Sequence, residues 1–314
     1  MEIFEILKSI FSSSELSNNQ AVKELRNKLE IHPIRRHQVN EIEEILSSFI
    51  SYRFSSKKNV GLSINAVEGA GKTHFIIEFL SDYFKLTGIT KGNKIYKLNS
   101  RQLVMMKPYF EKKLIIEKNK NSYLKLQNIL NNLELGSIVI LDDFYSKEPV
   151  LPYLFETIES ILNNKRYNQT CFILSGGYQK MKFIRKDYQI EYLFPLKFEL
   201  QFTAPTLNQL VELFIDYMRV REIKFENNVI PTLKYYFKKK QELSKMSRNL
   251  IYNGKLDKKE KITFAYAREL EDFLNSIILT KGNTNILIQV SDVRNSPLFL
   301  KNERKYNDLK RKYS

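Results

Sequence analysis

From Val60 to Phe202, the sequence alternates short apolar runs with longer segments that are suited to helices. Strands separated by helices at this rhythm imply a parallel sheet that is covered by helices on both faces. The predicted strands are Val60–Ala66, Lys94–Leu98, Ile138–Leu141, Thr170–Ser175 and Leu196–Phe202. The predicted helices between them are Lys72–Phe84, Ser100–Asn132, Val150–Asn164 and Gln179–Lys186. The expected fold class is therefore α/β.

After Thr203 the strand pattern stops, and Thr206 opens the first of several predicted helices. These helices are Thr206–Arg219, Glu226–Lys240 and Phe264–Leu279. The change of pattern divides the chain into four predicted parts. They are a helical N-terminal extension (1–34), an α/β core (35–204), a helical lid (205–284) and a basic C-terminal tail (285–314).

The loop between the first predicted strand and the first helix carries the strongest functional signal. It reads Ala66-Val67-Glu68-Gly69-Ala70-Gly71-Lys72-Thr73-His74. This follows the phosphate-binding pattern G-x-x-x-x-G-K-[ST], with Ala66 in place of the first glycine, which a negative φ would allow. Gly69 and Gly71 let backbone amides curve around a phosphate at the positive end of the following helix. The alternative is a chance glycine turn between a strand and a helix.

Two side chains of this loop have specific expected roles. Lys72 would neutralise the charge of the β- and γ-phosphates of ATP, and Thr73 would offer its hydroxyl to Mg²⁺. A second acidic motif supports this expectation, because the apolar run Ser137–Leu141 ends in Asp142 and Asp143. We assign Asp142 to the shell of the Mg²⁺ ion and Asp143 to orientation of the attacking water. The alternative is an acidic turn that caps the next helix.

The sequences Gly71-Lys72-Thr73-His74 and Leu141-Asp142-Asp143-Phe144 resemble those of AAA+ ATPases, a family whose core has a five-stranded parallel sheet and a helical lid. The closer resemblance is to the bacterial replication-initiator and helicase-loader branch. That resemblance implies ATP and Mg²⁺ as cofactors, with the nucleotide bound between core and lid, and a homo-oligomer or a protein partner. The stretch Gly177–Ile184, with Phe194 and Pro195, is also similar to the rubisco-activase-like remodelling ATPases.

The same resemblance suggests roles for two further residues. Ser175 ends the fourth predicted strand, where the family keeps its first sensor, and would hydrogen-bond the water or the γ-phosphate. Arg268, in the run Ala267–Asn275, matches the helix in which an arginine of the initiators reaches the γ-phosphate. The alternatives are an ordinary serine at a strand end and a surface arginine that pairs with Glu271 or Asp272.

The chain departs from the family in two places. The run Glu191–Pro195 lacks the arginine finger that AAA+ rings place before the last strand, and Arg185 or Lys186 could substitute for it. Most members have glutamate where this chain has Asp143, which is one methylene shorter. Both departures concern ATP hydrolysis and do not affect ATP binding. One interpretation is that the protein is a nucleotide-gated switch with little turnover. The segment Arg35–Gln38 lies where the family covers adenine, with a basic surface patch as the alternative.

The formal net charge of +16 favours a polyanionic partner, nucleic acid first, although a biased lysine-rich composition is the alternative. The predicted partner is DNA bound without sequence preference, because no base-reading motif is present. The competing function is remodelling of a protein client. Lysines interleaved with aromatic residues mark two candidate contact regions. They are Lys107, Tyr109, Phe110, Lys112, Lys113, Lys118, Lys120, Tyr123 and Lys125 in the core, and Tyr235, Tyr236, Lys238, Lys239 and Lys240 in the lid.

The remaining features of the composition indicate the cellular compartment and exclude a membrane span and a zinc site. A single cysteine, Cys171, excludes an intramolecular disulfide and, with no signal peptide evident, predicts a reducing cytoplasm. No apolar run approaches the roughly 20 residues that a membrane-spanning helix needs, so no membrane partner is expected. His32 and His37 lack the companions that a zinc site requires.

Overall fold

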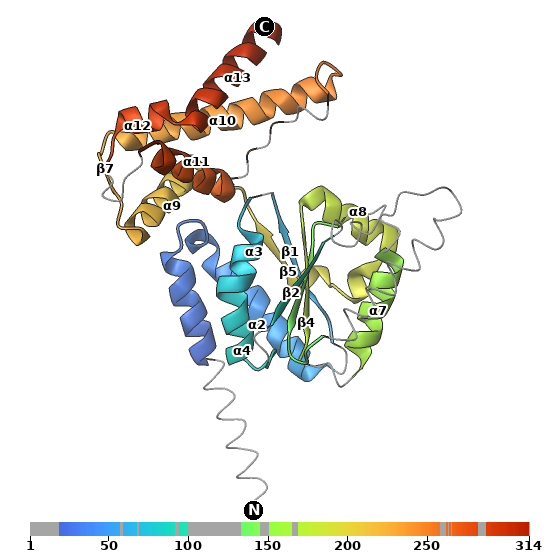
Figure 1. Cartoon of the computed structure of the whole chain (residues 1–314). Helices are drawn as coiled ribbons and strands as arrows, with labels where there is room; N and C mark the ends of the chain where they lie inside the picture. Colours follow the sequence, from blue (N-terminus) through green and yellow to red (C-terminus); the bar gives the residue numbers. More distant parts are fainter. Residues whose placement is uncertain are drawn as a thin grey trace, which may run out of the picture. The chain divides into compact units, whose positions relative to one another are not determined.

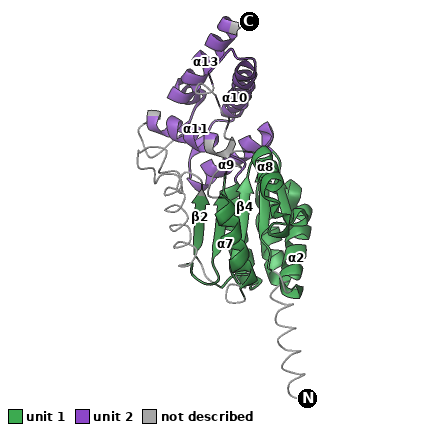
Figure 2. Cartoon of the chain, turned by 90° about the vertical axis from the view of Figure 1, so that its right-hand side faces the viewer, with its two compact units in different colours: residues 1–67, 72–203 green, residues 68–71, 204–314 purple. Residues whose placement is uncertain are grey.

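The computed structural model describes residues 19–56, 59–67, 69–91, 94–99, 133–144, 151–164, 169–257, 262, 264, 266–281 and 287–313. The chain divides into two compact units, which are coloured green and purple in Figure 2. The first unit comprises residues 1–67 and 72–203, and the second comprises residues 68–71 and 204–314. The main boundary therefore follows Thr203, where the strand pattern of the sequence stops.

The first unit is built on a five-stranded parallel sheet in the order β2-β3-β4-β1-β5. The strands are β1 (Leu62–Ala66), β2 (Ile95–Asn99), β3 (Ile138–Asp142), β4 (Cys171–Gly176) and β5 (Glu199–Phe202). They are the five strands predicted from the apolar runs, which confirms the α/β class. Strands β1, β3 and β4 are buried along almost their whole length because helices cover both faces of the sheet.

Helices lie on both faces of this sheet (Figure 1). On one face lie α2 (Val39–Ser55), α3 (Lys72–Phe75) and α4 (Ser81–Leu86), and on the other lie α7 (Leu151–Asn163) and α8 (Tyr178–Tyr188). A π-helical segment, Ile76–Leu80, joins α3 to α4, so the helix predicted over Lys72–Phe84 is interrupted. Short 3₁₀ turns cover Arg36–Gln38, Ile190–Tyr192 and Leu196–Phe198.

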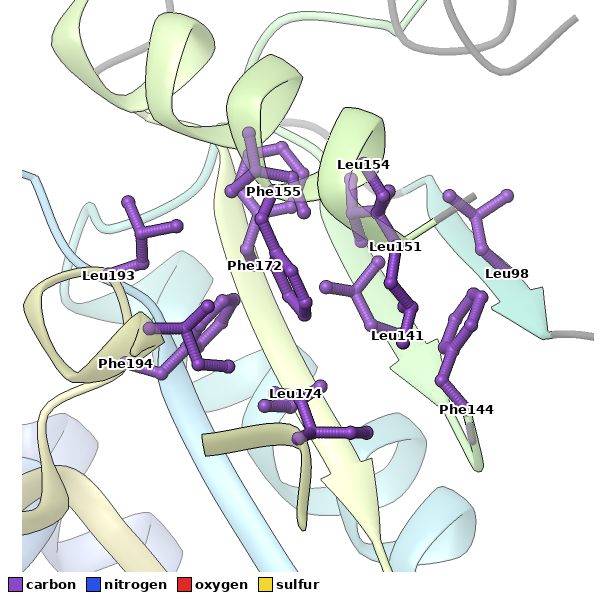
Figure 3. Close-up of a cluster of buried hydrophobic side chains, with 14 of the residues drawn as sticks. Leu98, Leu141, Phe144, Leu151, Leu154, Phe155, Phe172, Leu174, Leu193 and Phe194 are labelled. Carbon is purple, nitrogen blue, oxygen red and sulfur yellow. The ribbon is translucent and has the colours of Figure 1, made fainter. Parts of the chain in front are cut away.

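The hydrophobic core under α7 and α8 fixes the strands that carry the candidate site. Figure 3 shows Leu141 of β3 and Phe172 of β4 beside Leu154 and Phe155 of α7, with Leu174 further along β4 in the same cluster. All five side chains are at most 4% exposed. Burial of such side chains stabilises the fold by about 1.5–3 kcal/mol each. The ends of β3 and β4 are therefore held by a tightly packed layer.

A helix at residues 19–31 belongs to the first unit and is attached to it by charged contacts. Arg26 Nη2 lies 2.8 Å from Glu43 Oε2 of α2, and Lys28 Nζ lies 2.6 Å from Asp82 Oδ2 of α4. Its residues Ala21, Leu25 and Leu29 are buried. This part of the predicted N-terminal extension therefore packs on the core, while residues 1–18 lie outside the described residues.

The second unit is mostly helical, as predicted for the region after Thr203. Its helices are α9 (Leu207–Val220), α10 (Val229–Tyr252), α11 (Tyr266–Lys281), α12 (Val290–Asn295) and α13 (Pro297–Tyr313), and its strands are β6 (Lys224–Phe225) and β7 (Leu287–Ile288). Thr206 and Gln209 form a capping box at the start of α9. We expected a basic tail beyond residue 285, but β7, α12 and α13 belong to this unit.

The predicted lid cluster of aromatic and basic residues is largely structural. Tyr236 is buried and stacks on Phe273 of α11 at 3.7 Å, and its hydroxyl donates to Glu269 Oε1 at 2.8 Å. Lys240 Nζ pairs with the same carboxylate at 3.2 Å. These two residues therefore hold α10 to α11, which leaves Tyr235 and Lys238 as the exposed members.

Candidate nucleotide-binding site

The candidate site lies at the carboxyl edge of the sheet. Strands β3, β4 and β1 are adjacent and parallel, so their carboxyl ends meet at one edge. The register places Asp142 of β3 beside Ser175 of β4, and Asn65 of β1 beside Gly176 of β4. The segments that the two motifs mark are therefore brought together by the strand order, although they are about seventy residues apart in sequence.

The loop after β1 has the backbone that its glycines predict. Gly69 and Gly71 have φ values of 77° and 79°, in the left-handed region that glycine adopts without strain. Ala66 remains in β1, and the non-glycine residues with positive φ in the described part of the chain do not include it. Alanine is therefore tolerated in place of the first glycine. Lys72 Nζ donates to the carbonyl oxygen of Ala66 at 3.3 Å, while Glu68 lies outside the described residues.

The carboxylate of Asp142 is held from two sides. Ser175 Oγ donates to Asp142 Oδ1 at 3.1 Å, and Lys97 Nζ lies 2.7 Å from Asp142 Oδ2. The side chain of Asp142 is 15% exposed, so these contacts replace much of its hydration. The carboxylate therefore has a fixed orientation at the end of β3.

The Lys97 ammonium also donates to Thr73 Oγ1 at 3.3 Å. The hydroxyl of Thr73 and the carboxylate of Asp142 therefore lie on two sides of one positively charged group. A hydroxyl and a carboxylate are the oxygen ligands that Mg²⁺ takes in phosphate-transfer sites. The two predicted metal ligands are close enough to share a cation, so the residues present fit a magnesium ion.

Asp143 has a strained backbone at the edge of the site. Its φ is 60°, in the left-handed region, which aspartate tolerates better than most residues. Its amide donates to the carbonyl oxygen of Ser175 at 2.8 Å, and its Oδ2 lies 3.1 Å from Lys180 Nζ of α8. The backbone bond fixes the residue to β4, while the ion pair directs its carboxylate toward α8.

Ser175, which we expected to be the first sensor, contacts Asp142. Its side chain is buried, and its hydroxyl is used by Asp142. The hydroxyl of Ser175 therefore helps to orient the Asp142 carboxylate, and its contact with water or the γ-phosphate stays a prediction. Arg268 lies in α11, but its side chain is outside what the structure describes, so its role stays a prediction.

Two lysines of this site were missed by sequence reasoning. Lys97 was treated only as part of an apolar strand, and Lys180 only as part of a helix after β4. A charged residue inside an otherwise apolar run is the signal that could have marked Lys97. No comparable signal marks Lys180, because a lysine on the first turn of a solvent-facing helix is common.

Arg185 cannot replace the missing arginine finger as we had suggested. Its side chain is 8% exposed, and Nη2 pairs with Glu199 Oε2 at 2.5 Å. It also donates to Ser63 Oγ at 2.9 Å and to the carbonyl oxygen of Phe194 at 2.7 Å. A guanidinium committed to the core cannot reach a neighbouring subunit. Lys186, the other suggested residue, is exposed.

The segment predicted to cover adenine is also partly buried. The Arg35 guanidinium lies 3.6 Å from the centre of the Phe202 ring, and burial lowers its pKa to about 9. Ile34 and Val39, expected to pack on the base, are buried in the protein. Arg35 is therefore not part of a basic surface patch. His37 and Arg36 are exposed on the same turn.

Within the described residues, no group of three or more His, Cys, Asp or Glu side chains is gathered in a way that could hold a metal ion. The same part of the chain contains no helix long and apolar enough to cross a membrane. The predicted contact region over residues 107–125 lies outside the described residues. The site at the edge of β1, β3 and β4 is therefore the feature that best indicates a function.

The strand order β2-β3-β4-β1-β5, the glycine loop after β1 and the acidic pair at the end of β3 form the α/β arrangement that the resemblance to AAA+ ATPases predicts. No protein-family model matches the chain, and no curated protein matches it. Among solved structures, it is similar to RuvB of Thermotoga maritima, described as a Holliday junction branch migration motor. That match has 13% identity and a TM-score of 0.45, and covers 84% of this chain and 68% of the other. A mutant form of the same RuvB matches at 14% identity with a TM-score of 0.46, covering 85% and 68%.

Proposed function

We propose that this protein binds ATP with Mg²⁺ at the loop after β1 and hydrolyses the bond between the β- and γ-phosphates. One observation carries the proposal: the Lys97 ammonium contacts both Thr73 and Asp142. These residues lie beside a glycine loop in which Lys72 donates to the carbonyl oxygen of Ala66. Binding phosphate at such a loop requires backbone amides, a lysine and a hydroxyl, and all of them are present.

Each residue then has one task in the proposed site. Loop residues 66–71 and His74 would surround the phosphates, and Lys72 would neutralise their charge. Thr73 and Asp142 would hold Mg²⁺, whose charge stabilises the phosphate oxygens during transfer. Ser175 would keep Asp142 oriented. Asp143 would orient the attacking water once its carboxylate has separated from Lys180. Arg268 would contact the γ-phosphate.

The nucleotide assignment is tested by removing the lysine of the loop. Lys72→Ala should weaken ATP binding by at least about tenfold, because a charged contact to phosphate is lost. Titration of a fluorescent ATP analogue measures the change. Lys94→Ala, just before β2, is the control. Equal affinities of Lys72→Ala and the unaltered protein would show that the nucleotide, if it binds, binds elsewhere.

A nucleotide-gated switch with little turnover is a second candidate, and two observations favour it. Asp143 is paired with Lys180, and Arg185 is buried, so neither is ready for hydrolysis as it stands. A single-turnover measurement with radiolabelled ATP decides between the two. A hydrolase should release phosphate, and Asp143→Asn should bind ATP and retain it. A switch should retain ATP without any substitution.

We further propose that the protein acts on nucleic acid, as an initiator, a helicase loader or a transposition regulator, and works as an oligomer. The support is the net charge of +16 and the exposed basic residues of α10 and α13. These residues are Lys234, Lys238, Lys245, Arg248, Lys301, Arg304, Lys305, Lys310, Arg311 and Lys312. The test is the ATPase rate with and without single- and double-stranded DNA at two salt concentrations. No response to DNA would favour a protein client.

A further inference from the structure

We propose that Lys97 is a built-in competitor of the divalent cation at this site. Its ammonium takes the position between Thr73 and Asp142, and a metal ion binds there only after the lysine side chain has left. The inference rests on the proposed nucleotide site, because Thr73 and Asp142 are its metal-binding residues. It adds a residue, Lys97, that sets the affinity of the site for a metal ion.

The position of Lys97 follows from the sheet. Lys97 lies on β2 in register with Ile140 of β3, and Asn99 is in register with Asp142. Its side chain extends along the strand to the carboxyl edge, where Nζ lies 2.7 Å from Asp142 Oδ2 and 3.3 Å from Thr73 Oγ1. One ammonium therefore contacts oxygen atoms of both residues that the motifs assign to the metal.

The ammonium and a metal ion cannot use these atoms together. Mg²⁺ takes oxygen ligands at about 2.0–2.1 Å in a near-octahedral shell, whereas a lysine ammonium offers donors only. Two positive charges a few ångströms apart in a partly buried site also repel each other. Asp142 is 15% exposed, so its charge is poorly screened by water and a cation at this position is held firmly.

The lysine is nevertheless able to leave. Its side chain is 41% exposed, and its four-carbon stem can turn the ammonium into solvent. The other oxygen of Asp142 stays bonded to Ser175 Oγ, so the carboxylate keeps its orientation when Lys97 moves. The site therefore has two arrangements, one closed by its own lysine and one open to a metal ion.

The test is a direct measurement of metal affinity in the full chain. Mn²⁺ is titrated into the ADP-bound protein and free Mn²⁺ is followed by electron paramagnetic resonance. Lys97→Met keeps the length of the side chain and removes the charge, so it should lower the half-saturating Mn²⁺ concentration by about tenfold. Lys97→Arg keeps a positive charge and should leave the affinity low.

Lys94→Met is the matched control. Lys94 immediately precedes the same strand, its ammonium is 2.6 Å from Glu134 Oε2, and its loss should not change Mn²⁺ affinity. A Mn²⁺ affinity of Lys97→Met that equals or falls below that of the unaltered protein overturns the inference. Thermal unfolding checks that each variant is folded, and Lys97→Gln replaces Lys97→Met if the latter is not.

Failure of this inference is distinguishable from failure of the nucleotide site. ADP binding is first measured in EDTA for the unaltered protein and for Lys97→Met. If neither protein binds ADP with or without metal, the proposed nucleotide site is wrong, and the inference about Lys97 falls with it. If both bind ADP and their Mn²⁺ affinities coincide, only the role of Lys97 is wrong.

Discussion

At the scale of single residues, His32 shows how burial beside His74 and Phe79 changes the chemistry of a side chain. Its ring lies 6.0 Å from that of His74 and 5.5 Å from that of Phe79. Its Nδ1 accepts from the backbone amides of Ile34 at 3.2 Å and Arg35 at 3.3 Å. Burial, with the charge of Arg35 as a smaller cause, lowers the pKa of His32 to about 4.

This lowered pKa predicts a loss of stability in mild acid. Between pH 6.5 and pH 4 the unfolded chain takes up a proton at His32 that the folded chain does not, so the free energy of unfolding falls as the pH falls. The contribution lost between about pH 7.5 and about pH 5.0 is about 2 kcal/mol. Urea unfolding of the unaltered protein and of His32→Asn at both pH values measures it.

Asparagine at position 32 offers an oxygen to the same two amides but does not titrate. His32→Asn should therefore be less sensitive to pH than the unaltered protein by that amount. His37→Asn is the control, because His37 is exposed on the neighbouring turn. Identical pH slopes for His32→Asn and the unaltered protein would contradict the assigned protonation of His32.

The residues of the candidate site could be predicted from the sequence to different degrees. Lys72, Thr73, Asp142 and Asp143 were found because each occupies a fixed place in a motif next to a strand. Lys97 was not found, because its contacts depend on which strand lies beside β3, and the sequence does not state the strand order. The burial of Arg185 was missed for a similar reason, since its partner Glu199 lies on another element.

At the scale of elements, one buried ionic network joins α8 to two strands. Arg185 of α8 bonds to Ser63 of β1 and pairs with Glu199 of β5, and Asn65 Nδ2 donates to Glu199 Oε1 at 3.3 Å. Both members of the ion pair are at most 8% exposed. Removing only one of two buried charges leaves the other without compensation, which is costly.

We expect Arg185→Ala to lower the free energy of unfolding by about 3–5 kcal/mol. The double substitution Arg185→Met with Glu199→Met should recover a large part of that loss, because no buried charge is left unpaired. Denaturant unfolding measures both. Lys186→Ala, at the exposed neighbouring position, should change stability by less than about 0.5 kcal/mol. A stable Arg185→Ala protein with impaired ATPase activity would instead favour a catalytic role.

The elements themselves were largely predictable in the first unit. Strands β1, β3 and β4 are short apolar runs that are almost fully buried, so their composition alone marks them. The second unit was harder, because the segment after residue 285 is so basic that it suggested a tail. Its helix α13 is nevertheless anchored to α10, where Asn302 is buried and donates to Tyr236 Oη at 2.8 Å. The helix predicted at Ser100–Asn132 lies outside the described residues and stays a prediction.

At the scale of the whole molecule, the excess of positive charge predicts binding of DNA that weakens steeply with salt. Lys301 and Lys305 are exposed on α13, four residues apart and therefore on one side of the helix. Reversing both to glutamate should weaken DNA binding and reduce the slope of log affinity against log salt by about 1–2. Fluorescence anisotropy with a short duplex at several salt concentrations measures this slope.

The matched control reverses Lys182 and Lys186, which are exposed on α8 at the same spacing. It changes the net charge equally, so it separates a local contact from a general effect of charge. Similar losses for the two pairs would mean that DNA responds only to the overall charge. An unchanged slope for Lys301→Glu with Lys305→Glu would place the contact outside α13.

The left-handed backbone at Asp143 has a consequence for how this protein can be altered. Its φ of 60° admits glycine, asparagine and aspartate readily, and penalises glutamate and branched side chains. Aspartate at position 143, where the resemblance to AAA+ ATPases predicts glutamate, therefore suits the positive φ of the turn that follows β3. Replacing Asp143 by glutamate would therefore destabilise this turn, whereas substitution of Lys180 would remove the partner of the Asp143 carboxylate without straining the backbone.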